Sequence, residues 1–103
     1  MPQGALAMLV LRVLRSGPLH GYAIAQRIRR LSDAVLEAEE GSLYPTLQRM
    51  LMEGWVRGKW GVSKTKRRVR FYTLTRKGEK QLRCELDEYE QVTAAIQAIL
   101  RTA

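Results

Sequence analysis

The chain of 103 residues is poor in the groups from which metal sites and disulfides are built. It has one cysteine, Cys84, and one histidine, His20, too few for an internal disulfide or a cysteine–histidine zinc site. No apolar run approaches the roughly 18 to 20 residues of a membrane span, and the first residues lack the basic and apolar segments of a signal peptide. We therefore expect one small cytoplasmic domain with no membrane segment, metal or other cofactor.

The sequence also lacks the residue pairings that support catalysis. A single histidine has no second histidine to work with, and no glycine-rich phosphate loop is present. The adjacent carboxylates of Glu39 and Glu40 precede a turn, where water would surround them. These features argue against an enzyme.

Positive charge is in excess and is unevenly distributed. Lys and Arg total 18 against 10 Asp and Glu, which gives a net charge of +8. The whole excess lies in residues 1–75, which hold 13 basic and 5 acidic side chains. Residues 57–70 carry seven basic side chains and no acidic one. Such a cluster is typical of a surface that binds a polyanion, although taken alone it also fits a solvated hairpin, RNA or a membrane surface.

The spacing of apolar residues predicts three helices in the first half of the chain. Residues 6–14 and 22–31 both carry an apolar stripe at helical spacing. A third helix is predicted from Gly41-Ser42 to Gly54, with the Ser42 hydroxyl as its N-cap and Pro45 in the first turn. Between the second and third helices, Val35-Leu36 is predicted to form a short strand.

A β-hairpin and one long helix follow. Residues 55–60 and 69–74 are rich in aromatic and β-branched side chains, and a polar, basic connector separates them. We expect Trp55 and Trp60 to pack the hairpin on the helices. Thr75 can cap a final helix that runs to about Arg101. The predicted fold is mostly α with a small β-hairpin (α+β), a winged helix-turn-helix with a C-terminal helix.

The third helix has a polar outer face that suits the major groove of DNA. Its core face carries Leu43, Leu47, Met50 and Leu51. Its outer half carries Ser42, Pro45, Gln48, Arg49 and Met52, with Tyr44 and Thr46 at the edges. Arginine can bind guanine there and glutamine can bind adenine, while an ordinary surface helix has the same spacing.

The final helix carries an apolar stripe that its own domain is too small to cover. The stripe has the alternating spacing of four and three residues of a coiled-coil seam. It consists of Leu82, Leu86, Tyr89, Thr93, Ile96 and Leu100, widened by Val92 and Ile99. We therefore predict that residues 76–103 form a dimerisation helix attached to a DNA-binding unit at 1–75, and that the protein is a homodimer.

Two other classes fit parts of these observations. An RNA-binding or ribosome-associated protein would explain the charge, but RNA-binding sheets present aromatic side chains for base stacking, and here packing requires those side chains. An adaptor that kept the fold and lost DNA binding would not need so basic a hairpin.

Four segments resemble the PadR family of bacterial transcriptional regulators. They are residues 20–24, 40–47, 53–56 and 71–78, and the stretch Gly-Ser-Leu-Tyr-Pro at 41–45 is the most specific. The resemblance extends over nearly the whole chain. The single C-terminal helix is similar to that of the small PadR subfamily.

The resemblance implies a homodimeric winged helix that binds a palindromic operator in double-stranded DNA, usually as a repressor at the bacterial nucleoid. It implies that Tyr22 supports the recognition helix and that the wing touches the DNA backbone, and it allows a small-molecule inducer. Together with the outer-face pattern, it predicts DNA contacts from Tyr22, Ser42, Tyr44, Pro45, Thr46, Gln48, Arg49, Lys64, Lys66, Arg67 and Arg68. Two departures are a more basic wing tip at 63–68 and the absence of tryptophan after Trp60, where Tyr89 can take its place.

Overall fold

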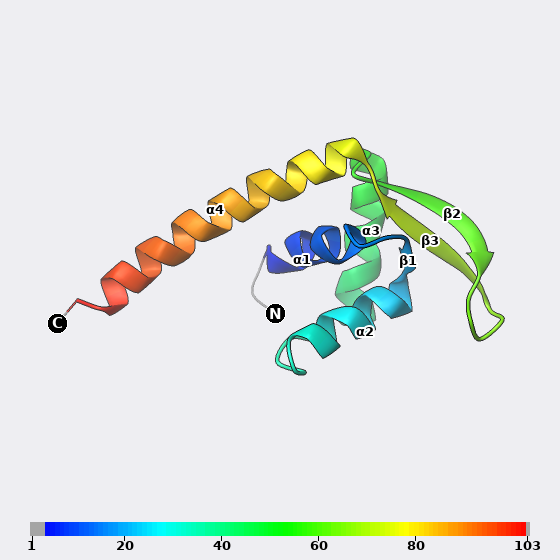
Figure 1. The fold of residues 1–103 in the computed structure, drawn as a ribbon, viewed down its shortest axis with the longest axis horizontal. Helices are drawn as coiled ribbons and strands as arrows, with labels where there is room; N and C mark the ends of the chain where they lie inside the picture. Colours follow the sequence, from blue (N-terminus) through cyan, green and yellow to red (C-terminus); the bar gives the residue numbers. More distant parts are fainter. Residues whose placement is uncertain (1–3, 103) are drawn as a thin grey trace.

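The computed structural model describes residues 4–102, which form four helices and one three-stranded antiparallel sheet (Figure 1). The elements in chain order are α1 (Ala5–Leu14), β1 (Leu19–His20), α2 (Gly21–Leu31), α3 (Glu40–Glu53), β2 (Val56–Val62), β3 (Arg68–Leu74) and α4 (Arg76–Leu100). This is the predicted α+β arrangement of a winged helix-turn-helix, with β2 and β3 as the wing. None of the helices in this part of the chain combines the length and the apolar character that crossing a membrane requires.

One core joins the three short helices to the base of the wing. The apolar stripes predicted on the first three helices supply most of it. The stripe of α2 is buried at Ile24 and Ile28, whereas Tyr22 and Leu31 at its ends stay exposed. The buried side chains are Met8, Val10, Leu11, Val13, Leu14, Ile24, Ile28, Leu43, Leu47, Met50, Trp55, Val56, Tyr72 and Leu82. The core thus fixes α3 and the wing relative to each other, since both contribute to it.

The sheet differs from the prediction in its third strand. Val35-Leu36 forms no strand: Val35 is 80% exposed, and the preceding Asp33 and Ala34 have positive φ angles, which interrupt an extended chain. The third strand is β1, in which Leu19 pairs with Tyr72 and His20 with Phe71. A two-residue strand is defined by its partner strand and leaves no pattern of its own in the sequence.

The wing is longer than predicted. β2 and β3 pair from Val56 opposite Leu74 to Val62 opposite Arg68, which leaves a loop of residues 63–67. Lys66 in this loop has a positive φ of 61°, and its N–H donates to the carbonyl of Ser63. The basic residues of the tip therefore sit on a tight turn at the end of a regular ladder.

The first turns of α4 are fixed to the rest of the domain. The Thr75 hydroxyl oxygen accepts a hydrogen bond from the Gly78 N–H at 3.0 Å, so the predicted N-cap is confirmed. A Cβ on Gly78 would collide with the carbonyl oxygen of Trp55, which explains why glycine stands there. Leu82 then inserts its side chain fully into the core.

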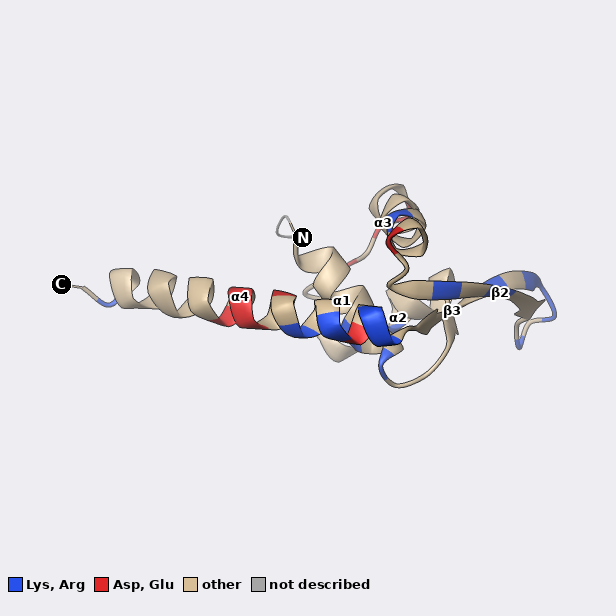
Figure 2. Cartoon of the chain, turned by 90° about the horizontal axis from the view of Figure 1, so that it is seen from above, with Lys and Arg blue, Asp and Glu red and all other residues tan. Residues whose placement is uncertain are grey.

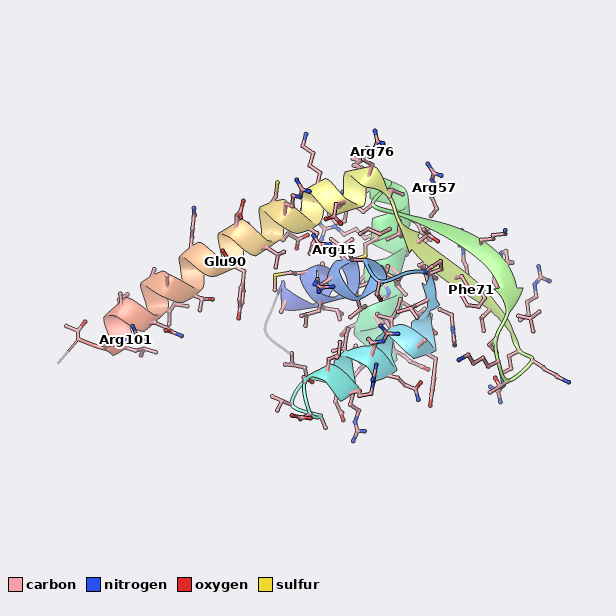
Figure 3. The ribbon with its side chains drawn as sticks, in the orientation of Figure 1. Arg15, Arg57, Phe71, Arg76, Glu90 and Arg101 are labelled. Carbon is pink, nitrogen blue, oxygen red and sulfur yellow. The ribbon has the colours of Figure 1, made fainter. Side chains whose placement is uncertain are left out.

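An ion pair adds to this attachment. Arg15 at the end of α1 donates through two nitrogens to the carboxylate of Glu79 in α4 (Figure 3). The bound guanidinium holds the pKa of Glu79 below its ordinary value. This contribution to stability is therefore present at neutral pH and is lost as the pH falls through the lowered pKa. Beyond Leu86, α4 projects away from the body of the protein (Figure 1, Figure 2).

Candidate nucleic-acid interface

The N-cap of helix α3 lies three residues earlier than predicted. Its N-cap is Glu39 rather than Ser42, no side chain caps it, and the N–H groups of Ser42 and Leu43 both donate to the Glu39 carbonyl. Pro45 therefore lies in the second turn, where it removes the N–H that would bond to the Gly41 carbonyl. Gly41 is exposed, so water can satisfy that carbonyl. Ser42 and Pro45 nevertheless remain on the exposed side of the helix.

Two of the segments that carry the family resemblance meet at one contact. The Tyr44 ring lies against Gly21 at the start of α2, where its hydroxyl is 2.8 Å from the position that a Cβ would occupy. Only glycine leaves room for that ring. The contact fixes the start of α3 on the start of α2, while 46% of Tyr44 stays exposed. Tyr22 lines an open hollow together with Glu39 and Glu40 at the start of α3.

The outer face of α3 presents Gln48 to solvent, but Arg49 is engaged with the protein itself. The Arg49 guanidinium lies over the ring of the buried Trp55, 5.3 Å from the ring centroid. Thr46 donates its hydroxyl to the Ser42 carbonyl at 2.8 Å, so its hydrogen also has a partner within the helix. Met52, at the far end of the same face, is 80% exposed. Among the outward-facing polar side chains of α3, Gln48 is therefore the longest that has no side-chain partner within residues 4–102.

The wing carries positive charge along its whole length (Figure 2). Lys64, Lys66, Arg67 and Arg68 are exposed, and none of them forms an ion pair within residues 4–102. With no acidic residue between Arg57 and Arg70, nothing on the hairpin offsets this charge. An uncompensated basic hairpin beside the recognition helix is suited to the phosphates of a duplex.

The side of the wing that continues the core face holds two further contacts. A Cβ on Gly58 would collide with Arg70, because the Arg70 guanidinium lies across that glycine. Trp60, two residues further along β2, is 57% exposed, and Arg68 lies over its ring at 5.0 Å. The expectation that both tryptophans pack on the helices therefore holds for Trp55 and is wrong for Trp60, which lies beyond the reach of the core.

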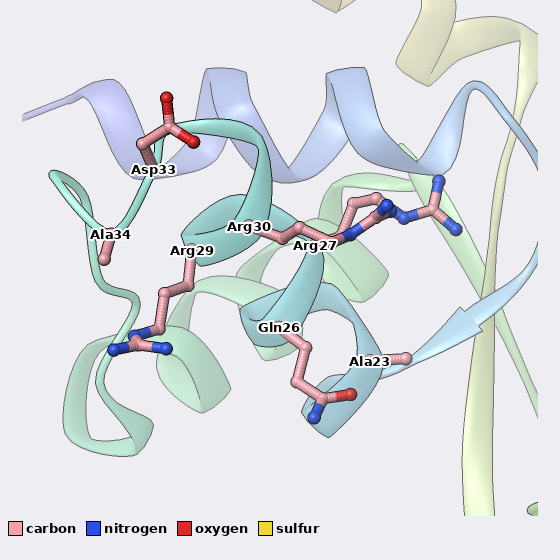
Figure 4. Close-up of a pocket in the computed structure, with 7 residues that line it drawn as sticks. All are labelled: Ala23, Gln26, Arg27, Arg29, Arg30, Asp33 and Ala34. Atoms are coloured by element: carbon pink, nitrogen blue, oxygen red, sulfur yellow. The ribbon is translucent and has the colours of Figure 1, made fainter.

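The outer face of α2 adds arginines that were not among the predicted site residues. They line an open hollow of about 740 Å³, whose lining residues are Ala23, Gln26, Arg27, Arg29, Arg30, Asp33 and Ala34 (Figure 4). Arg29 pairs with Glu37 at 3.1 Å, and Arg27 donates to the Ser16 hydroxyl. Helical periodicity places these arginines on an outer face, but only the fold shows that Arg29 also lines a hollow with Glu39 and Glu40 at the start of α3.

The apolar stripe of α4 divides into a buried and an exposed part. Leu82 is fully buried in the core of its own protomer, and Leu86 packs partly against that core, so Leu82 is unavailable to a partner. The remaining large side chains are half to three-quarters exposed: Tyr89 (53%), Val92 (51%), Ile96 (51%), Ile99 (72%) and Leu100 (76%). Residues 91–100 contain no charged side chain, as the distal half of α4 in Figure 2 shows.

The part of the chain that the structure describes brings together no cluster of metal-ligating side chains. No group of three or more His, Cys, Asp or Glu side chains within residues 4–102 is placed to hold a metal ion. The surface formed by α2, α3 and the wing is instead basic and exposed, which suits a large polyanion better than a small substrate.

Known proteins share both the sequence pattern and the fold. The chain matches the Transcriptional regulator PadR-like family over residues 10–84. The structure of a transcriptional regulator from Clostridium thermocellum is similar over 96% of each chain, with a TM-score of 0.88 and 26% identity. The structure of a PadR family transcriptional regulator from Eggerthella lenta is similar over 98% of this chain and 86% of that chain, with a TM-score of 0.81 and 29% identity.

Among curated proteins, the Negative transcriptional regulator PadR of Bacillus subtilis is 26% identical over 91 residues. The alignment covers 88% of this chain and 50% of that protein, so the chain spans about half the length of this relative. The family match itself extends from α1 through the wing into the fixed part of α4. The chain therefore belongs to the PadR-like family of transcriptional regulators and is not an enzyme.

Proposed function

We propose that this protein is a homodimeric repressor that binds an inverted-repeat operator in double-stranded DNA. In this proposal α3 enters the major groove, the wing contacts the flanking backbone, and α4 joins two protomers. The regulator would act on the chromosome in the cytoplasm, where occupancy of a promoter blocks transcription.

The observation that carries DNA binding is the uncompensated charge of the wing. Its seven basic side chains, from Arg57 to Arg70, follow directly after the recognition helix and have no acidic neighbour on the hairpin. Phosphate contacts from Lys and Arg release bound counterions, which supplies much of the affinity for a duplex. The polar side chains of α3 would then select the sequence.

The exposed stripe from Tyr89 to Leu100 supports the dimer. Five large apolar side chains on a projecting helix stay at least half exposed within the described chain. Contiguous apolar surface of this kind marks a protein contact, and a twofold pair is the commonest closed assembly. A dimer would place two recognition helices about one DNA turn apart, roughly 34 Å, as an inverted repeat requires.

The Bacillus subtilis relative is a negative transcriptional regulator, which supports repression as the direction of control. The experiment that tests the whole proposal is a footprint on the DNA just upstream of the protein's own gene. We expect a protected inverted repeat, and we expect single-stranded RNA to compete only weakly for the protein. RNA that competes as well as the duplex would favour the RNA-binding alternative and contradict the proposal.

Neutralising the wing tip should lower the salt dependence of DNA binding. With Lys64→Gln and Lys66→Gln together, we expect weaker binding to all duplexes alike and a slope of log K against log salt that is smaller by about 2. Fluorescence anisotropy with a labelled duplex at several salt concentrations measures this slope. The matched control is Lys80→Gln with Arg101→Gln, which removes the same charge from α4. A loss confined to the operator, with an unchanged slope, would show that these lysines read sequence.

Removing the Gln48 side chain should relax selectivity at one position of each half-site. Losing a good bidentate contact to a base costs about 1–3 kcal/mol of discrimination. Arg49→Ala is the matched comparison, and we expect a smaller effect because its guanidinium lies over Trp55. Binding to operators with single base-pair changes separates the two variants. If both keep full selectivity, the specificity comes from Tyr44 or from DNA shape.

A further inference from the structure

We propose that Trp60, with Arg68 stacked on it, is an apolar contact of the wing to the minor groove of the bound duplex. It would make the wing sensitive to the shape of the groove that flanks each half-site. This inference rests on the proposed DNA binding. It assigns a second role to a hairpin whose basic residues otherwise account only for phosphate contacts.

The strand register places Trp60 on the face of the hairpin that continues the core. Gly58 pairs with Tyr72, Trp60 with Arg70, and Val62 with Arg68, and directly paired residues share one face of a sheet. Tyr72 on this face is buried. Arg70 and Tyr44 are both close enough to it to act on its pKa, which burial raises. Trp60 and Val62 therefore continue, toward the wing tip, the face of the hairpin whose base is the buried Tyr72.

The packing of Trp60 shows that the protomer does not use it as a core residue. Its side chain is 57% exposed and that of the neighbouring Val62 is 67% exposed. The cation–π contact with Arg68 is the one aromatic contact found for this ring within residues 4–102. By contrast, Trp55 at the base of the same hairpin is 7% exposed. A tryptophan and a valine side by side in water are costly surface residues unless a partner covers them.

Charge identifies the partner as a duplex and not a protein with an apolar face. The ring lies among the seven basic side chains of the hairpin, so a partner that covers it must be strongly negative. With α3 in a major groove, the groove next to it along the duplex is a minor groove, which the wing would face. Apolar side chains and arginines are the groups that proteins place in minor grooves. Trp60 supplies the apolar ring and Arg68 the guanidinium, and the cation–π contact between them holds the two side chains together.

This assignment predicts a preference that no base-specific hydrogen bond explains. Narrow A·T-rich minor grooves have an enhanced negative potential that attracts arginine, and flexible steps are easier to open for an aromatic ring. Changing the base pairs that flank a half-site should therefore alter the affinity of the wild-type protein. The same changes should have little effect once Trp60 is replaced.

Tryptophan fluorescence gives a direct test, because the other tryptophan is buried. The probe is a duplex selected from a randomised pool by the wild-type protein, and the neutral quencher acrylamide reports on access to the ring. Without DNA, we expect acrylamide to quench one accessible tryptophan in the wild type, and we expect this accessible component to be absent from Trp60→Phe. With the duplex bound, as seen in a mobility shift, we expect that tryptophan to become protected in the wild type.

An affinity measurement complements the fluorescence. Trp60→Ala should weaken duplex binding about tenfold and leave the salt slope unchanged, whereas Lys64→Gln with Lys66→Gln lowers the slope. Because Trp60 is exposed, the melting temperature of Trp60→Ala should stay close to that of the wild type, which separates a lost contact from a folding defect.

Three outcomes would count against this role for Trp60. A clear mobility shift with no change in acrylamide access would overturn it and leave DNA binding intact. Protection that increases with protein concentration in the absence of DNA would assign the ring to a second copy of the chain. Failure to bind any duplex would instead overturn the proposed function itself.

Discussion

Two lysines on the exposed stripe of α4 should turn the protein into a monomer that binds its operator no better than random DNA. In the double variant Ile96→Lys with Ile99→Lys, two charges replace apolar side chains that a partner would bury, each contributing on the order of 1.5–3 kcal/mol. Without the dimer the two half-sites are bound separately, so we expect operator affinity to fall by about a thousandfold or more, to the non-specific level. Sedimentation velocity measures the mass and anisotropy measures the affinity.

These two positions separate dimerisation from folding. Ile96 and Ile99 are 51% and 72% exposed, so lysines there leave the protomer core untouched, whereas Leu86 packs partly against that core. The matched control is Gln91→Lys with Ala98→Lys, which adds the same charge to the opposite side of α4. The control should remain dimeric and bind normally. A wild-type protein that sediments as a monomer, or an Ile96 and Ile99 variant that still dimerises, would eliminate this seam.

The substitution Gly78→Ala should strongly lower the stability of the folded protein, although it adds only one methyl group. The new Cβ would collide with the backbone carbonyl of Trp55 and would crowd Leu74, so α4 has to move away from the α3–β2 turn. Overpacking of this kind costs about 2–3 kcal/mol, which corresponds to a fall in Tm of roughly 10 °C or more. Thermal unfolding at one fixed protein concentration measures the loss, since dimerisation makes Tm depend on concentration.

Gly41→Ala is the matched control for this prediction. Gly41 is also inside a helix, but an added Cβ there meets nothing within 4 Å. The substitution should stabilise the protein by about 0.5–1 kcal/mol, because glycine loses more freedom than alanine in a helix. Equal effects at the two glycines would show that the contact with Trp55 does not limit the position of α4.

The order of elements was predictable because long apolar patterns determine it. The stripes of α1, α2 and α3 each repeat several times, and all three helices contribute to the core, although the α2 stripe is buried only in its middle and leaves Tyr22 and Leu31 exposed. The short strand β1 was not predictable, because Leu19 and His20 become a strand only by pairing with β3. The start of α3 was misplaced for a related reason. Ser42 is a good N-cap by residue type, but the chain enters the helix at Glu39, where no side chain caps it.

The sequence predicted which faces of the candidate interface are exposed, but it did not predict the side-chain contacts made there. Helical spacing correctly placed Gln48 and Arg49 on the outside of α3, but it cannot show that Arg49 folds back over Trp55. Composition identified the wing as basic, but it could not show that Trp60 lies beyond the core. The contact between Tyr44 and Gly21 joins segments that are distant in the sequence, so only the fold reveals why a glycine and a tyrosine stand at these positions.

Helix α4 is fixed to the body of the protein at one end only, so a small rotation at that end displaces the other end by a larger distance. Its base is held by the Gly78 contact, the Arg15–Glu79 ion pair and Leu82, while the part from Leu86 to Leu100 extends for about 21 Å beyond the body. A tilt of about 10° at the base would move the far end by about 4 Å, close to the 3.4 Å rise of roughly one base pair. In the proposed dimer, a small change of angle at the Arg15–Glu79 pair would therefore be enough to shift the two α3 helices relative to their half-sites.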